Sequence, residues 1–313
     1  MSSTSAASPA QGAYAGLADL IALRFAARQL SLVRRKRALR QLAGPNNSNF
    51  RGRGLDFEEV RAYQNGDDIR SIDWRVTART GSAHTKLFRE ERERPVLIVV
   101  DQRNSMFFGS SHCFKSVLAA QLGSLLAWSA LQAGDRVGGL VFDDHGHSEI
   151  RPKRSRRQVL ALLSDVERFN HALPLASSAS ATPFADMLAN LRRIARPGSS
   201  IFLISDFRAA NTSEAREQWF ELAKHTEITA LACTDPLEMT LPREGTYAVT
   251  DGRQRSELNT GDRALRERFS RHVASQRDAL SQYLLRLGIP LLSASTDSPP
   301  LRLLQTYYGE RRR

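Results

Sequence analysis

Residues 96–105 read V-L-I-V-V-D-Q-R-N-S, an apolar run that ends at the carboxylate of Asp101 and is followed by the hydroxyl of Ser105. An unbroken apolar run of this length predicts a strand buried on both faces, as in a parallel sheet covered by helices on each side. Ligands of such sheets bind just beyond the carboxyl ends of the strands. We therefore expect Asp101 to lie where this fold places its chemistry.

Further apolar runs alternate with helical segments after Pro95. Such alternation produces βαβ units, so the sequence predicts an α/β fold with a doubly wound, mostly parallel sheet. Hairpins are expected around residues 143–146 and within residues 246–258. The expected strands are residues 96–101, 136–142, 200–205, 227–232 and 289–293, and the expected helices are residues 114–133, 155–168, 183–195, 213–224 and 261–287.

The chain divides into four predicted parts. Residues 1–12 have the composition of a disordered terminus. Residues 13–44 are predicted to form an N-terminal amphipathic helix, which the breaker sequence G-P-N-N-S-N ends. Residues 45–94 form a charge-dense subdomain of small, mixed β structure, and residues 95–313 form the α/β domain.

The composition is that of a soluble globular protein, with 41% hydrophobic and 25% charged residues. Two cysteines are too few for a disulfide scaffold or a zinc site and suit a reducing, cytoplasmic compartment. No segment has the apolar length of a membrane span. The formal net charge of +12 is compatible with a nucleic acid, an anionic membrane or an acidic protein as partner, and a compositional bias toward Arg over Lys explains it equally well. The basic clusters lack interleaved aromatic residues, which makes a nucleic-acid groove the weaker interpretation.

Several strand ends carry oxygen ligands. The strand at 200–205 leads into Asp206, and Thr182 precedes the helix at 183–195. We expect them to meet Asp101 and Ser105 at one sheet edge. Carboxylate and hydroxyl oxygens suit Mg or Mn. The set resembles the metal-ion-dependent adhesion site of von Willebrand factor A domains, in which Asp-x-Ser-x-Ser is followed by a Thr and an Asp.

Arg103 departs from that motif, because it stands where the first Ser would be. A cation at ~4 Å from a divalent ion costs about 8 kcal/mol at an effective dielectric constant of ~20. Two outcomes remain open: Arg103 turns to solvent and leaves a weakened metal site, or its guanidinium pairs with Asp101 or Asp206 and replaces the ion. A simpler interpretation is that Asp101 and Ser105 only cap the loop and the next helix.

A second charged signature spans residues 52–80. Its acidic and basic side chains alternate around Tyr63 and Trp74. They either bridge one another and fix a small subdomain, or present a docking surface with anchors of the types found at binding hot spots. The candidate docking residues are Arg61, Asp67, Asp68, Arg70, Asp73, Trp74 and Arg75.

The stretch from residue 52, G-R-G-L-D-F-E-E-V-R-x-Y-x-x-G-D-D-I-R-x-I-D-W followed by A-R-T-G, resembles the defining motif of the domain-of-unknown-function 58 family. The resemblance continues through D-Q-R-N-S-M-F-F-G-S, Q-A-G-D-R-V-G and L-I-S-D-F. It implies a von Willebrand factor A-like domain in a bacterial cytoplasmic protein. It also implies a partner, because members of this family are thought to work beside MoxR-type AAA+ ATPases in the maturation of other proteins.

The function expected from these features is non-enzymatic: a protein-interaction module that joins a MoxR-type AAA+ ATPase and a client protein. The stretch G-S-S-H-C-F-K-S, residues 109–116, has Phe114 where a phosphate-binding loop needs its second Gly, so Lys115 and Ser116 are expected to begin a helix. The alternatives are a metal-dependent hydrolase that uses the sheet-edge carboxylates and nucleic-acid binding through the basic patches.

Overall fold

The computed structural model describes residues 10–32, 56–64, 72–89, 95–172, 183–250 and 255–309. The chain divides into two compact units. The larger unit comprises Met1–Ser48 and Arg94–Arg313, and the smaller one comprises Asn49–Glu93.

The larger unit is built on a central sheet, which has six strands in the part of the chain that the structure describes. Neighbouring strands are parallel except for the last two, which form an antiparallel hairpin at one edge. The predicted α/β class with a mostly parallel sheet is thereby confirmed. In spatial order the strands are β10 (Leu291–Ser295), β7 (Glu227–Thr234), β6 (Ser200–Ser205), β3 (Pro95–Asp101), β4 (Arg136–Phe142) and β5 (His147–Lys153).

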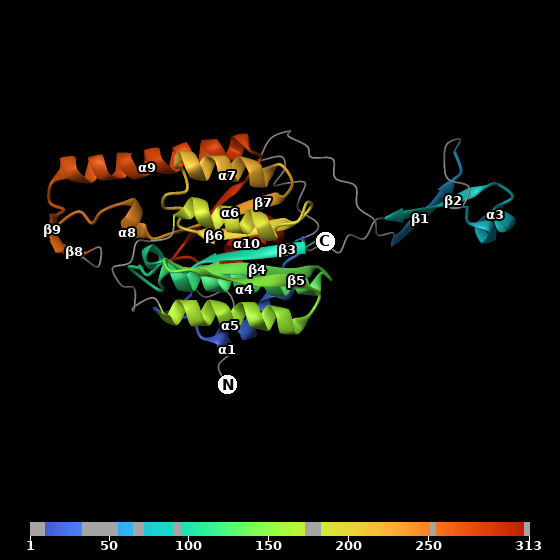
Figure 1. Cartoon of the computed structure of the whole chain (residues 1–313), viewed down its shortest axis with the longest axis horizontal. Coiled ribbons are helices and arrows are strands. Elements are labelled where there is room, and N and C mark those ends of the chain that lie inside the picture. Colours follow the sequence, from blue (N-terminus) through green and yellow to red (C-terminus); the bar gives the residue numbers. More distant parts are fainter. Residues whose placement is uncertain are drawn as a thin grey trace. The chain divides into compact units, whose positions relative to one another are not determined.

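Helices cover both faces of this sheet (Figure 1). The side chains of β3 alternate between two cores: Ile98 faces one and Leu97 the other, and both are fully buried. This two-sided burial is why the strand is apolar without a break. One face carries α4 (Lys115–Gln132), α5 (Arg156–Ala172) and α10 (Pro300–Tyr308); the other carries α6 (Phe184–Ile194), α7 (Ser213–Ala223) and the end of α9 (Arg263–Arg286).

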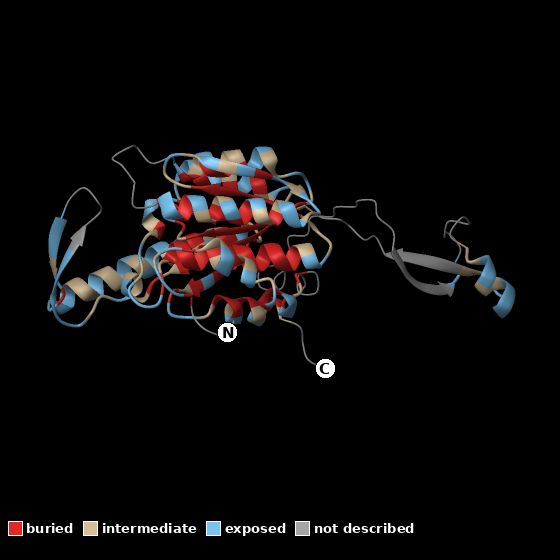
Figure 2. Cartoon of the chain, turned by 90° about the horizontal axis from the view of Figure 1, so that it is seen from below, coloured by how far each residue is buried: buried red, intermediate tan, exposed pale blue. Residues whose placement is uncertain are grey.

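The helix α4 is the most deeply buried helix of the described part, and Figure 2 shows the buried layer that it forms with the sheet. Gly123 allows this close approach, since a Cβ there would lie 2.9 Å from Cγ2 of Val100. The strand expected at 289–293 begins two residues later, at Leu291. Pro290 has no N–H to donate to a ladder, which explains the later start.

The prediction of one continuous helix over residues 13–44 is wrong in the described part. α1 (Leu17–Ala22) ends early, and a 3-10 turn, η1 (Ala26–Gln29), follows. The carbonyl of Leu20 accepts hydrogen bonds from Ser124 Oγ at 2.6 Å and Trp128 Nε1 at 3.2 Å. These hydrogen bonds from α4 take the place of the backbone hydrogen bond to Leu20 that would continue the helix. Residues 33–44 lie outside the described residues.

The remaining elements are short. The hairpin expected within residues 246–258 is present as β8 (Thr246–Thr250) and β9 (Arg255–Asn259), ahead of α9. A one-turn helix, α8 (Pro236–Met239), follows β7. In the smaller unit, β1 (Asp56–Ala62) pairs antiparallel with β2 (His84–Arg89), and α3 (Trp74–Thr80) lies between them in sequence. Every helix among the described residues is too short or too polar to span a bilayer.

Candidate functional site

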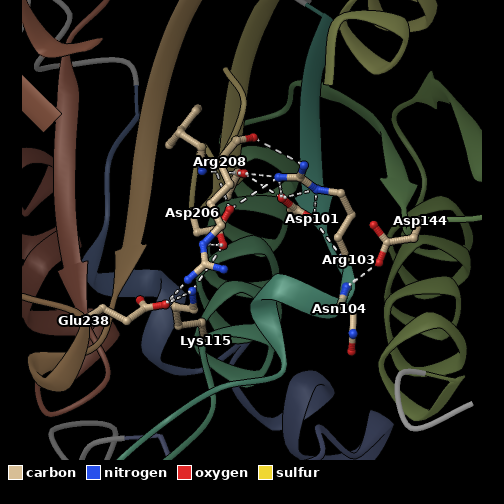
Figure 3. Close-up of polar contacts among 10 residues, drawn as sticks. Asp101, Arg103, Asn104, Lys115, Asp144, Asp206, Arg208 and Glu238 are labelled. Atoms are coloured by element: carbon tan, nitrogen blue, oxygen red, sulfur yellow. Dashed lines mark hydrogen bonds and ion pairs between the residues drawn. The ribbon is translucent and has the colours of Figure 1, made fainter. Parts of the chain in front are cut away.

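Asp101 and Arg103 form the centre of the site at the carboxyl edge of the sheet (Figure 3). Asp101 is the last residue of β3 and is fully buried. Arg103 turns back toward it: Nη2 lies 2.7 Å from Oδ2, and Nε lies 3.1 Å from both carboxylate oxygens. The backbone N–H of Arg103 also donates to Oδ1 at 2.8 Å. The carboxylate therefore binds both the main chain and the side chain of the same residue.

The guanidinium of Arg103 also reaches the next strand. Its Nη2 lies 3.3 Å from Oδ1 of Asp206, which follows β6, while Ser205 Oγ donates to Asp101 Oδ2 at 2.6 Å. Phe142 and Phe184 lie against the cation, with ring centroids 5.6 and 5.1 Å from its Cζ. Of the two outcomes left open by the sequence, the structure shows the second: the guanidinium pairs with both carboxylates.

Lys115 and Glu238 extend this centre toward the surface. Lys115, the first residue of α4, has a fully buried side chain whose Nζ lies 3.1 Å from Asp206 Oδ2 and 2.7 Å from Glu238 Oε1. Arg208 Nη2 lies 2.9 Å from the same Glu238 oxygen, and the Arg208 side chain is 62% exposed. The chain of ion pairs thus runs from a buried centre to an exposed guanidinium. We call these residues the ion network: Asp101, Arg103, Lys115, Asp206, Arg208 and Glu238.

The ion network is balanced in charge, with three carboxylates and three cations. Burial raises the pKa of the Asp101 carboxyl, and the charge of Arg103 opposes that rise. Although burial works in the opposite direction, Lys115 and Arg103 hold the pKa of Asp206 below its ordinary value. Burial likewise opposes ionisation of Arg103, but Asp101 and Asp206 raise its pKa. The buried cation stays charged because two carboxylates face it.

The loop after β6 is strained where it meets the ion network. Phe207 and Ala209 have φ values of 58° and 61°, in the left-handed region that non-glycine residues rarely adopt. Ser205 Oγ accepts a hydrogen bond from the Phe207 N–H at 2.9 Å, and Asp206 Oδ1 accepts one from the Arg208 N–H at 3.1 Å. The same side chains that bind Asp101 and Arg103 therefore hold this backbone. Strain of this kind is concentrated at functional sites.

Asp235 fixes the other side of the site. This buried carboxylate follows β7 and accepts hydrogen bonds from the backbone N–H and the Oγ of Ser110, at 2.8 and 2.6 Å, and from Thr296 Oγ1 at 2.6 Å. It also caps α8 through the Leu237 N–H. Although burial opposes it, these hydrogen bonds lower the pKa of Asp235. Asp235 thereby orients α8, which carries Glu238.

The predicted metal ligands are only partly brought together. Asp101 and Asp206 meet, with Arg103 between them. The hydroxyl of Ser105, in the 3-10 turn η3 (Asn104–Met106), is buried and has no hydrogen-bond partner in the described part of the chain. Thr182 lies outside the described residues. As these side chains lie, they do not fit Mg or Mn, because the guanidinium occupies the space between the two carboxylates.

The predicted docking residues belong to the smaller unit. Asp73 caps α3 by accepting hydrogen bonds from the backbone N–H groups of Arg75 and Val76. Trp74 is 69% exposed, and Arg75 is exposed as well. Arg61 lies in β1, and residues 67, 68 and 70 (Asp67, Asp68 and Arg70) fall outside the described residues. Their docking role remains a prediction.

The sequence did not identify Lys115, Arg208 and Glu238 as site residues. A signal existed for the neighbouring Asp235, since it follows a buried strand as Asp101 and Asp206 do. The position of Lys115 at a helix start was predicted and is confirmed. Its contact with Glu238 joins residues 123 positions apart, which no local pattern reveals.

The chain as a whole is similar to several known proteins. The family model described as "Protein of unknown function DUF58" matches residues 59–279. The uncharacterized protein Rv1480 of Mycobacterium tuberculosis is 29% identical over 292 residues, which cover 93% of this chain and 90% of that protein. Among solved structures, the conserved hypothetical protein BatB from Bacteroides thetaiotaomicron matches with 18% identity and a TM-score of 0.37, over 62% of this chain and 98% of that one. The SpRpn10 VWA domain matches with 13% identity and a TM-score of 0.34, over 68% and 94%.

Proposed function

Because this chain belongs to the family described as "Protein of unknown function DUF58", whose description assigns no activity, we propose its function from the site: it is a non-enzymatic protein-interaction module. The partner surface is the carboxyl edge of the sheet, centred on the ion network. The observation that carries this proposal is the position of the Arg103 guanidinium between Asp101 and Asp206, where the resembling motif would hold a metal ion.

The hydrogen bonding of the carboxylates supports recognition over catalysis. A general base must reach a substrate proton, and a metal ligand must have a free lone pair facing the ion. Asp101 already accepts from the main chain and side chain of Arg103 and from Ser205. Asp206 accepts from Arg103, Lys115 and the Arg208 N–H. Both carboxylates serve to hold loops in place, and those loops form the surface that a partner meets.

The rim of the ion network has the character of a binding surface. Arg208 is 62% exposed, and two apolar side chains on the segments around the ion network, Phe108 and Leu237, are 39% and 36% exposed. Phe108 lies in the loop before α4 and Leu237 lies in α8, and the Ser110–Asp235 hydrogen bonds join this loop to the start of α8. A rigid rim that combines exposed apolar groups with an arginine is the composition of interface hot spots.

We assign the partner from the family resemblance: a MoxR-type AAA+ ATPase, with a client protein as the third member. The smaller unit supplies a second contact surface through α3, where Trp74 is 69% exposed and its helix is capped by Asp73. An exposed tryptophan on a capped helix is an anchor of the kind that partner proteins bury.

Co-purification of the cognate ATPase with the full chain tests this function. We expect Arg208→Ala and Leu237→Ser to reduce the recovered ATPase about tenfold, a loss of the size that one anchor contributes. Lys224→Ala is the matched control: Lys224 is a partly exposed cation paired with Glu221, and it lies just before β7 begins, at the opposite edge of the sheet. Equal recovery with all three variants would refute the proposed surface.

A further inference from the structure

A cavity of about 610 Å³ adjoins the ion network. Its walls are the loop after β6, the end of β7, α8 and one face of α9. Ligand pockets in proteins are of this size and are mostly lined by apolar groups. The apolar side chains that line the cavity include Ala232, Met239, Phe269, Val273, Leu280 and Leu291.

The wall formed by α9 is a stripe of apolar side chains along one face of the helix, and the other described residues leave its first half partly uncovered. The lining residues Phe269, Val273 and Leu280 recur at helical spacing and so share one face of the helix. Leu280 and Leu284, near the end of α9, are its only buried residues, whereas Phe269 and Val273 in its first half are half-buried. In Figures 1 and 2 this first half extends beyond the helices that cover the sheet. The stripe thus presents apolar groups to a space that the described residues do not fill.

The same helix is strongly basic. It carries six arginines against Glu267 and Asp278. Arg268, Arg271 and Arg277 form no ion pair with a carboxylate of the described residues, whereas Arg263 is paired with Glu267. Between Arg268 and Arg277 the helix rises about 14 Å at about 1.5 Å per residue. A positive field of this length exceeds a small ligand and matches a segment of polypeptide.

We propose that this cavity is the docking groove for an acidic segment of the partner protein, which inserts an apolar side chain against Phe269 and Val273. The inference rests on the proposed protein-binding function and names the chemistry of the segment that is bound. Arg277 in the lining and the exposed Arg268 and Arg271 of the same helix complement the carboxylates of the segment, and Arg208 contributes a cation from the opposite wall.

The strained loop supports a pre-formed groove. Phe207, Arg208 and Ala209 all line the cavity, and the first and last of them have left-handed backbone conformations. Hydrogen bonds to Ser205 and Asp206 hold this loop without a ligand. A wall that is already fixed lowers the ordering cost of binding.

The lining also favours a peptide over a nucleic acid. Asp206 and Glu238 line the cavity together with its apolar groups. A phosphate backbone carries a charge at every residue and would have to place some of these charges beside the two carboxylates, whereas a polypeptide segment can place an uncharged side chain there. An apolar side chain fills the cavity, while the carboxylates next to it in the segment contact the outer arginines.

Site-specific photo-crosslinking of the full chain in its native cells tests the groove. A photoreactive phenylalanine analogue replaces Val273, which lines the cavity, or Ala274, which is exposed on another face of the same helix. We expect about tenfold more crosslinked protein at position 273 than at 274, because only the face of α9 that carries position 273 lines the cavity. Mass spectrometry of the adduct should identify a segment rich in Asp and Glu. No excess over position 274, a basic segment, or an adduct with nucleic acid would overturn the proposal.

Charge reversal on α9 provides the second measurement. Arg268→Glu, next to Phe269, should lower the crosslink at position 273 about tenfold, since a repulsive contact replaces an attractive one. Arg286→Glu is the matched control, because Arg286 is exposed at the other end of the same helix. If the adduct is acidic but its yield is unchanged by Arg268→Glu, the proposal is also overturned.

The two proposals can fail separately. If the chain gives no excess crosslink at position 273 but ATPase binding still depends on Arg208, the groove alone is refuted. If the crosslink forms as expected but ATPase binding does not depend on Arg208, the ATPase surface alone is refuted.

Discussion

The guanidinium of Arg103 reaches back over one residue to the carboxylate of Asp101, with Nη2 2.7 Å from Oδ2. The side chain of Asp101 is fully buried and that of Arg103 is 9% exposed. The pair therefore places a fixed cation of the protein's own chain at the end of β3. Asp206 meets the same guanidinium at 3.3 Å, which makes Arg103 the link between two neighbouring strand ends.

Removal of this cation should destabilise the protein. Arg103→Ala leaves the buried carboxylates of Asp101 and Asp206 without their shared partner, and breaking a buried pair in this way costs about 3–5 kcal/mol. The free energy of unfolding, measured by denaturant titration, gives the loss. Arg168→Ala is the control, since that side chain is 61% exposed in its pair with Asp165. A change for Arg103→Ala as small as that of the control would contradict the structural role.

Replacement of Arg103 by serine should create a metal site. Arg103→Ser restores the motif residue and removes the repulsion of about 8 kcal/mol that a cation ~4 Å from a divalent ion imposes at an effective dielectric constant of ~20. We expect isothermal titration with Mg²⁺ or Mn²⁺ to show weak or no binding to the wild type and a clear gain in the variant. The bound ion should also raise the thermal midpoint of the variant alone. Equally tight binding to both proteins would be the opposite result.

Acid should remove stability through Asp206 and Asp235. The pKa of each is held below the ordinary value of 3.8 in the folded state. Their contribution is therefore complete above that value and is lost as the pH falls through the folded pKa. Burial raises the pKa of Asp101, so its contribution to stability has the opposite pH dependence: it is present at low pH and is lost as the pH rises through the folded pKa. Asp235→Asn should lower stability at pH 7 and flatten the fall in stability that begins as the pH drops below the ordinary Asp pKa of 3.8. An unchanged fall in stability would show that Asp235 is not the source.

The two cysteines should be unreactive in the folded protein. Both are buried, and burial raises the pKa of Cys113 to about 12 and that of Cys233 well above its ordinary value. Thiolate is the reactive form, and little thiolate is present at pH 8 because this pH lies below the raised pKa values. A thiol-titration reagent should react slowly with the native protein and rapidly after denaturation. Fast reaction of either cysteine in the native state would show that its surroundings open readily.

The fold was largely predictable because the central strands β3 and β6 carry unbroken apolar runs. The apolar run at 96–100 placed β3, and the carboxylates that follow β3 and β6 placed Asp101 and Asp206 at one edge. The early end of α1 was not predictable, since it depends on side chains of α4 that hydrogen-bond to Leu20. The sequence also left the role of Arg103 open. Its pairing depends on the distance between two strand ends, which only the folded chain defines.

The dissociation constant of the full chain for the proposed partner, a MoxR-type AAA+ ATPase, decides whether the carboxyl edge of the sheet is a recognition surface. It should be measured for the wild type, for Arg208→Ala at the exposed end of the ion network, and for Lys224→Ala at the opposite edge of the sheet. We expect about tenfold weaker binding for Arg208→Ala, equal to about 1.4 kcal/mol, and no change for Lys224→Ala. Identical constants for all three proteins would contradict the assignment of this sheet edge as the recognition surface.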